Sequence, residues 1–504
     1  MRKITRQPMR WFLFTLCALL GSCASQQPYI TNNLQAEPNT TNSLEACKAF
    51  FQSLDAAINK AGVRDGQWHI VSGYPFLRTS RFLSAYRHTP MTETEFSAWL
   101  DQMQKADISS REIEISNLAG VSNSLKLFDN QDTRQLTKTT KECSGILRRA
   151  VPTTPSVVKH IRENVIVPDD YQNWKRWFGI YPISSQFVSM GINDYYKKTR
   201  LDFRRPMRTL TSYGLINRYI PVKNKRLNKL TIGEFLSNAA GQSPLGIPEP
   251  SQTALEKLYS HYAPVLEIDV SGRYDQIGTI QLGSDGIPTV LANQPAVYGY
   301  HSFTHYRGSA LLQLNYVFWF SQRPPKKSLD MLSGYLDGIT FRITLSAAGQ
   351  PIMYDAIHNC GCYHMFFPAG HFVANPAANM QAESPLVPQH APTLKPGQRM
   401  VIRISSQDHM IQRLYADTAR RGNHYQMFDY NTLRSLPMAD KSRHSMFNPN
   451  GIVEGTQRPE RFLLWPMGVP SPGAMRQRGR HATAFLGKRH FDDGNLLENL
   501  FIIR

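Results

Sequence analysis

The chain has no apolar stretch long enough for a membrane-spanning helix. Its apolar-dominated run near the start covers only residues 11–20, and no later run reaches 18 apolar residues. A helix needs about 20 such residues to cross the hydrocarbon core of a bilayer. We therefore expect the body of the protein to lie outside the bilayer.

Several sequence signatures of enzymes are also missing. The chain contains no GxSxG, GxxxxGK[ST], GxGxxG or HExxH pattern and no internal repeat. These patterns mark serine hydrolases, phosphate-binding loops, dinucleotide-binding domains and zinc proteases, respectively. The first 300 residues are also poor in histidine, with four of the fifteen in the chain. Imidazole chemistry, if present, is therefore expected in the later part.

The first 22 residues have the features of an export signal. Four basic residues precede or flank the short apolar run, and small residues follow it. This combination is typical of a secretory signal peptide. Leu20-Gly21-Ser22-Cys23 then resembles the lipobox of bacterial lipoproteins. The resemblance implies cleavage before Cys23, lipidation of Cys23 and, with Ala24 next, a lipid anchor in the outer membrane, most simply on its periplasmic face.

Basic residues outnumber acidic ones, 57 to 38, which gives a formal charge of +19. Loss of residues 1–22, which contain four basic residues and no acidic one, lowers it to +15. Such a surface favours anionic envelope components, such as lipid headgroups or acidic polysaccharide. A solvated basic surface is the more common explanation, and nucleic acid is not expected in this compartment.

Four cysteines remain after the signal and the lipidated position: Cys47, Cys143, Cys360 and Cys362. An even number in an exported protein favours disulfides. Cys47 and Cys143 each lie on the apolar face of an expected helix. We therefore predict a disulfide between Cys47 and Cys143.

The patterns of apolar residues predict an α+β protein: a helical N-terminal domain followed by a mainly antiparallel β-rich domain. Helical spacing dominates early, whereas "GITFRITL" at 338–345 alternates with the period of a strand. A segment rich in Gly and Pro near residue 245 reads as a linker. The expected organisation is signal peptide 1–22, flexible tether 23–42, helical domain 43–240, linker 241–260 and β-rich domain 261–504.

The strongest candidate site is "HNCGCYH" at 358–364, where His358, Cys360, Cys362 and His364 occupy alternate positions. An extended stretch of this length covers about 20 Å, too far for both histidines to hold one ion. A turn at Gly361 could gather both cysteines and one histidine. Zinc or copper accepts these ligands, and His301, His305 or His371 could complete the set.

Three other interpretations of this stretch stay open. Cys360 and Cys362 could form a strained, easily reduced disulfide. Cys362 could be a nucleophile, with His364 or His358 as base and Asp355 orienting it. The thiols could also be inert parts of a strand. Asp355 and Asp337 are isolated acids among apolar strands, for which pairing with Arg342 or Arg403 is the structural alternative.

Two further segments carry chemistry-bearing side chains. Trp174, Trp177 and Phe178 suit either a membrane interface or, more commonly, a core. The segment 476–494 combines five basic residues with histidines and aspartates. It could bind a phosphate or carboxylate, although a solvated basic loop is the favoured interpretation.

Together these patterns favour a lipid-anchored envelope protein with a metal- or thiol-dependent, hydrolase-like activity. The alternative is a non-catalytic module, with structural disulfides, that binds an anionic glycan, a lipid or an assembly partner. Convergence of the histidines on the cysteines would favour the enzyme.

Overall fold

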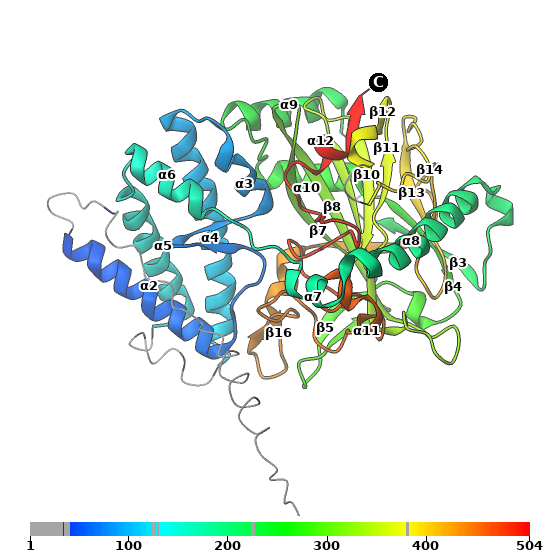
Figure 1. Cartoon of the computed structure of the whole chain (residues 1–504), viewed down its shortest axis with the longest axis horizontal. Coiled ribbons are helices and arrows are strands. Elements are labelled where there is room, and N and C mark those ends of the chain that lie inside the picture. The colour runs from blue at the N-terminus through cyan, green and yellow to red at the C-terminus, as the bar shows by residue number, and fades with distance from the viewer. Residues whose placement is uncertain are drawn as a thin grey trace, which may run out of the picture.

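The computed structural model describes residues 34, 41–121, 124, 128, 131–222, 227–379 and 383–503. The predicted signal peptide and Cys23 lie outside these residues, as does nearly all of the predicted tether. The described chain forms a helical part beside a larger part built on a curled sheet (Figure 1). None of its described helices is both long and apolar enough to cross a membrane.

The helical part packs around a main apolar core, which includes Phe51, Phe76, Trp99 and Ile161, and a smaller cluster that includes Leu54 and Leu118. Thr92 caps α4, the longest described helix, by accepting a hydrogen bond from the Glu95 backbone, and the Glu95 side chain accepts one from the Thr92 backbone. The elements of this part are α2 (Thr41–Ala61), β1 (His69–Val71), β2 (Tyr74–Thr79), α3 (Arg81–Ala85), η1 (Tyr86–His88), α4 (Glu93–Leu118), α5 (Thr133–Arg149) and α6 (Pro155–Asn164).

The predicted disulfide is present in this core. Cys47 on α2 is bonded to Cys143 on α5, 96 residues later. Both cysteines are buried, as expected from their positions on the apolar faces of the two helices.

A ten-stranded sheet forms the centre of the larger part, in the order β11-β10-β9-β8-β7-β15-β3-β4-β13-β14. The pairs β7–β15, β15–β3 and β4–β13 are parallel, and the other neighbours are antiparallel. The strands are β3 (Leu215–Pro221), β4 (Val265–Val270), β7 (Ala296–Tyr306), β8 (Ser309–Arg323), β9 (Gly334–Leu345), β10 (Pro351–His358), β11 (Met365–Pro368), β13 (Gln398–Ile404), β14 (Ile411–Thr418) and β15 (Asn423–Asp429).

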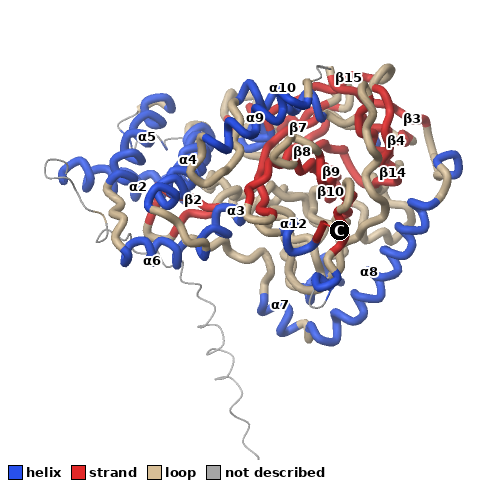
Figure 2. Tube along the Cα trace, turned by 90° about the horizontal axis from the view of Figure 1, so that it is seen from above, coloured by secondary structure: helices blue, strands red, loops and turns tan. Residues whose placement is uncertain are grey.

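In Figure 2, α9 and α10 lie at one side of the larger part, and α7 and α8 lie at the other. Apolar residues of α8, α9 and α10, such as Phe203, Leu236 and Leu258, share one core with the sheet, whereas α7 has no buried residue. The bounds of these helices are α7 (Asn173–Phe178), α8 (Tyr181–Arg204), α9 (Lys229–Gly241) and α10 (Gln252–Tyr262).

Strand β9 shows the predicted alternation. Ile339, Phe341 and Ile343 belong to the main core, while Arg342 and Thr344 face the other way yet are also buried. The second face is buried because short elements and loops of the C-terminal segment lie over it. These elements are β12 (Phe372–Ala374), η6 (Tyr430–Arg434), β16 (Leu436–Pro437), β17 (Arg443–His444), α11 (Arg461–Leu464), η7 (Trp465–Met467), α12 (Leu496–Leu500) and β18 (Phe501–Ile503). The other short elements of the described residues are η3 (Met207–Thr209), η4 (Arg273–Asp275), β5 (Thr279–Leu282), β6 (Pro288–Leu291) and η5 (Pro376–Asn379).

The α+β class is confirmed, with helices first and a mainly antiparallel sheet after them. Two elements differ from the expected organisation. Strand β3, from the segment expected to be helical, pairs inside the large sheet. Helix α10 occupies half of the segment expected to be a linker and buries Leu255 and Leu258. The division into domains at residue 240 stays a prediction.

A buried ion pair joins the two parts of the molecule. Asp65, which follows α2, accepts two hydrogen bonds from Arg434 on η6, at 2.5 and 3.2 Å. Gln477 also donates to Asp65, at 2.9 Å. Burial alone would raise the pKa of Asp65, but the nearby Arg434 charge and these hydrogen bonds lower it to about 2.

Removal of the disulfide should destabilise the helical part. We expect Cys47→Ser/Cys143→Ser to lower the free energy of unfolding by about 2–4 kcal/mol, because the bond closes a long loop and restricts the unfolded chain. Urea unfolding followed by circular dichroism measures the change. Wild-type protein treated with reductant should behave like the variant, and an unchanged midpoint in both would contradict the expectation.

Asp65 should make the protein sensitive to acid. We expect Asp65→Asn to cost about 3–5 kcal/mol at pH 7, because it leaves the buried Arg434 without its carboxylate. In the wild type the pKa is lower in the folded state, so the stabilisation is complete above about pH 4 and is lost as the pH falls toward 2. Urea midpoints across this range measure it. The exposed Asp194→Asn is the control, and equal acid sensitivity of the Asp65 variant and the wild type would contradict the assignment.

Candidate active site

The stretch 358–364 forms a turn between β10 and β11, which is one of the conformations that its sequence allows. The backbone N–H of Gly361 donates to the carbonyl of His358 at 2.7 Å, and that of His358 donates to the carbonyl of Cys362 at 3.0 Å. Gly361 has a φ of +90°, and a Cβ there would lie 2.5 Å from the Ala482 carbonyl oxygen. The turn therefore requires glycine for both reasons.

The C-terminal segment holds this turn in place. The Arg476 backbone N–H donates to the carbonyl of Asn359 at 2.8 Å, and the Arg476 Nε donates to the carbonyl of Cys360 at 3.2 Å. The side chain of Asn359 accepts a hydrogen bond from Thr340 at 2.7 Å. The cysteines thus lie on a turn whose backbone is fixed from both sides.

Cys360 and Cys362 are free thiols that lie against each other. The backbone N–H of Cys362 donates to the Cys360 Sγ at 3.3 Å. Burial alone would raise the pKa of the Cys360 thiol, but the hydrogen bond from the Cys362 side chain and the charge of Arg458 lower it below its ordinary value. The pKa of Cys362 is raised well above its ordinary value, because it holds the proton directed at Cys360 and is buried. Cys360 is therefore the more acidic thiol.

The side chain of His364 is oriented by the buried ion pair between Arg342 and Asp355. Arg342 makes two parallel hydrogen bonds to Asp355, at 2.5 and 2.9 Å, and the His364 Nε2 lies 2.9 Å from the same carboxylate. Burial lowers the pKa of His364 to about 4 despite Asp355. Burial would raise the pKa of Asp355, but Arg342 and His364 lower it.

These shifts define the tautomer of His364. At neutral pH the imidazole is uncharged, so its Nε2 carries the proton and donates it to the ionised Asp355. The Nδ1 is buried and has no hydrogen-bond partner among the described residues. A lone pair on an oriented, uncharged imidazole is the arrangement of a general base.

Both thiols and His364 line one cavity of about 600 Å³, which we call the thiol cavity. Its lining comes from α8, the 358–364 turn and the C-terminal segment around α11 and η7. Most of its walls are apolar. The lining residues are Ser184, Phe187, Val188, Gly191, Ile192, Tyr195, Tyr196, Cys360, Cys362, Tyr363, His364, Glu383, Glu460, Leu463, Leu464, Pro466, Met467, Val469, Pro472, Ala482, Thr483, Ala484 and Phe485.

The rim of the thiol cavity is itself apolar and exposed. Phe187 and Leu463 line the cavity, yet 67% and 66% of their surface is exposed. On the adjoining α7, Trp177 is 77% exposed, so the prediction that this aromatic stripe packs in a core is wrong. An exposed apolar rim gives an apolar ligand a continuous route to the thiols.

The other predicted ligands lie elsewhere. His358 faces Asp337 at 3.4 Å, and Asp337 also pairs with His409 and Arg458. His301 lines a different cavity, described below. His305 stacks on Phe82, with ring centroids 4.6 Å apart.

No group of three or more His, Cys, Asp or Glu side chains in the described part of the chain could hold a metal ion. The predicted set of His358, Cys360, Cys362, His364, His301 and His305 is spread over several sites instead, and it does not fit a zinc or copper centre. The catalytic set of Cys362, His364 and Asp355 is brought together in part. Asp355 orients His364, and Cys362 lines the same cavity, but Cys360 is the more acidic thiol.

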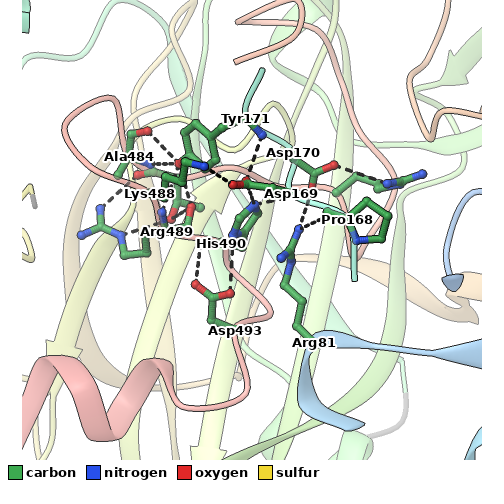
Figure 3. A network of polar contacts seen from close by, with 12 residues as sticks. Arg81, Pro168, Asp169, Asp170, Tyr171, Ala484, Lys488, Arg489, His490 and Asp493 are labelled. Atoms are coloured by element: carbon green, nitrogen blue, oxygen red, sulfur yellow. Dashed lines mark hydrogen bonds and ion pairs between the residues drawn. The ribbon is translucent and has the colours of Figure 1, made fainter. Parts of the chain in front are cut away.

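The segment 476–494 is not a solvated loop. Arg476, Arg489 and His490 are buried, and Arg489 and His490 belong to a polar network that ties distant parts of the chain together (Figure 3). His490 faces Asp169, Asp170 and Asp493 at 3.4–3.6 Å. The favoured interpretation failed because most acids that face this segment are distant in sequence: Asp169 lies 319 residues before Lys488, and Glu383 lies 106 residues before Arg489.

Sequence reasoning missed Arg458, whose charge acts on Cys360, and the exposure of the rim. It identified the Arg342–Asp355 pair as a structural alternative, and the structure confirms this pair. The sequence contained a signal for the burial of Arg342. It lies on the face of β9 opposite the apolar side chains, and the strand as a whole is too apolar to be exposed.

The lowered pKa of Cys360 should be visible in its reactivity. We expect the rate of alkylation by iodoacetamide to rise with pH through a midpoint below that of an ordinary thiol. Cys362→Ala should raise the midpoint, because it removes the hydrogen bond to the thiolate. Peptide mapping identifies the labelled cysteine, and the disulfide-bonded Cys47 and Cys143 are unlabelled internal controls. Preferential labelling of Cys362 at the lowest pH would contradict the assignment.

Comparison of the chain with protein-family models, with curated proteins and with solved structures gave no match. The functional argument therefore rests on the geometry of these residues.

Proposed function

We propose that the protein is a thiol-dependent acyl hydrolase of the cell envelope, anchored to the outer membrane by lipid on Cys23. The observation that carries the proposal is the thiol cavity itself. Its wall holds an acidified thiol and an uncharged histidine oriented by a carboxylate. This combination supports nucleophilic catalysis.

The lining of the cavity supports the choice of substrate. Tyr195, Met467 and Phe485 are typical of its walls, which consist mainly of apolar side chains. Such a wall binds an acyl chain through the hydrophobic effect. The buried position of Cys360, which is 3% exposed, disfavours a folded protein as the substrate. An ester with an apolar acyl chain is therefore the substrate class that fits.

The reaction follows from the roles of the three side chains. The Cys360 thiolate attacks the carbonyl carbon, a C–S bond forms and the C–O bond breaks. The departing alkoxide takes the proton of Cys362 and leaves as the alcohol.

Water then attacks the thioester while the His364 Nδ1 accepts its proton. The C–S bond breaks, the carboxylic acid leaves and the Cys360 thiolate is restored. The proton on His364 passes to Cys362, so the net reaction converts ester and water to acid and alcohol.

Chain-length kinetics on the full chain in detergent tests the proposal. We expect kcat/KM for p-nitrophenyl esters to increase as the acyl chain lengthens from two to about ten carbons. Cys360→Ser should lower kcat at least 100-fold, because a serine hydroxyl at this position has no base bonded to it. Asp355→Asn should lower kcat through loss of the active tautomer of His364.

Two controls make the result specific. Met207→Ser, at an exposed position outside the thiol cavity, should leave the kinetics unchanged. Circular dichroism checks that each variant is folded. Esters that bind but are not hydrolysed would contradict the proposal and favour a non-catalytic lipid-binding module. Hydrolysis that persists in Cys360→Ser would also contradict it.

A further inference from the structure

A second cavity, of about 260 Å³, lies between the helical part and the sheet, and we call it the interface cavity. The helical part contributes residues just before β1 and residues of α3 and α4, while the larger part contributes β7, one residue of β9, the loop before α10 and the C-terminal segment. The lining residues are Gln67, Trp68, Ser80, Phe82, Leu83, Gln102, Lys105, Ala106, Ser109, Ile247, Glu249, Tyr300, His301, Ser302, Phe303, Arg342, Asn431, Arg478, Gly479, Phe491 and Asp492.

Buried polar atoms in this wall lack hydrogen bonds within the described chain. The clearest case is Gln67, whose side chain is 2% exposed as a residue and whose Oε1 and Nε2 are both unpartnered there. The Arg478 Nε and the Asp492 Oδ1 also have no hydrogen-bond partner within the described chain, although the Asp492 Oδ1 lies 3.6 Å from the Arg81 Nε. A buried amide without partners costs free energy, so this wall is arranged for a ligand that both donates and accepts hydrogen bonds.

The charges in the wall offset one another. Lys105 pairs with Glu249 at 3.1 Å, and Arg342 pairs with Asp355, which lies outside the wall. The wall also holds Arg478 and Asp492. Burial and the charge of Arg478 lower the pKa of His301 to about 4, so it is uncharged at neutral pH. A ligand with a large net charge would bring a charge that these residues do not balance. The cavity therefore favours a neutral ligand.

Aromatic faces complete the wall. The guanidinium of Arg478 lies 5.5 Å from the centre of the Trp68 ring and 4.7 Å from that of Tyr300. Phe82 and Phe303 add apolar surface. A sugar ring presents C–H faces to aromatic rings and a rim of hydroxyls, each of which donates and accepts.

We propose that the interface cavity binds a neutral saccharide, with Trp68 as the stacking surface and Gln67 as the central hydrogen-bonding group. The site is separate from the thiol cavity and does not depend on the proposed hydrolase activity. Arg342 and Phe491 form the side of the interface cavity nearest the Asp355–His364 pair.

Titration calorimetry of the full chain, in a detergent without a sugar headgroup, tests this site. The probes are glucose, N-acetylglucosamine and their β-1,4-linked disaccharides, with glucose 6-phosphate as the charged comparison. We expect at least one neutral probe to bind with a Kd in the millimolar range or tighter and the phosphate to bind at least tenfold more weakly. No binding of any neutral probe, or stronger binding of the phosphate, would overturn the proposal.

Two variants separate binding from folding. Trp68→Ala and Gln67→Leu should each raise the Kd at least tenfold, while Trp177→Ala on α7 should leave it unchanged. Gln67→Leu should leave the unfolding midpoint unchanged or raise it, because it replaces an unpartnered buried amide by an apolar side chain of similar size. Wild-type affinity in Gln67→Leu would overturn the assignment. A loss of stability that accounts for the loss of binding would show that Gln67 is structural and would also overturn it.

Discussion

The buried ion pair between Arg342 and Asp355 is the interaction on which the rest of the site depends. The two side chains lie on neighbouring strands and are 3% and 1% exposed, so both charges lose their hydration. Such a pair is tolerated only when its geometry is good and its remaining hydrogen-bonding atoms are satisfied. Here the two hydrogen bonds are parallel, the Arg342 Nη1 donates to the Phe491 carbonyl at 2.6 Å, and the Phe491 ring lies 3.6 Å from the guanidinium.

This pair determines what each cavity can do. It presents an ionised carboxylate to His364 and so fixes which ring nitrogen is protonated in the thiol cavity. The other end of the pair, Arg342, lines the interface cavity. A chain of contacts from Arg342 through Asp355 to His364 thus links a residue of the interface cavity with a residue of the thiol cavity. The C-terminal segment packs beside this chain of contacts, since the Phe491 carbonyl accepts from Arg342, and its Lys488, Arg489 and His490 lie in a polar network with acids from other parts of the chain (Figure 3).

Local patterns predicted the elements but not the pairing between them. The α+β class, the alternation in β9 and the turn at Gly361 follow from period and residue type, and the Cys47–Cys143 bond follows from two apolar helix faces. The ion pair of Arg480 does not follow, because its partner Asp170 is 310 residues away. Likewise, the spacing of His301 and His305 says nothing about their distance from the cysteines. Helix α10 was missed because glycines and prolines before it resemble a linker.

The central claim is that Cys360 forms a thioester with the substrate. Intact-mass spectrometry of the full-length His364→Ala variant, mixed with an apolar p-nitrophenyl ester, tests it most directly. Without the base for the second step, the account predicts that the protein gains the mass of one acyl group, mapped to Cys360 and released by hydroxylamine. The absence of any acyl adduct on a folded protein, or an adduct on a residue other than Cys360, would contradict the account.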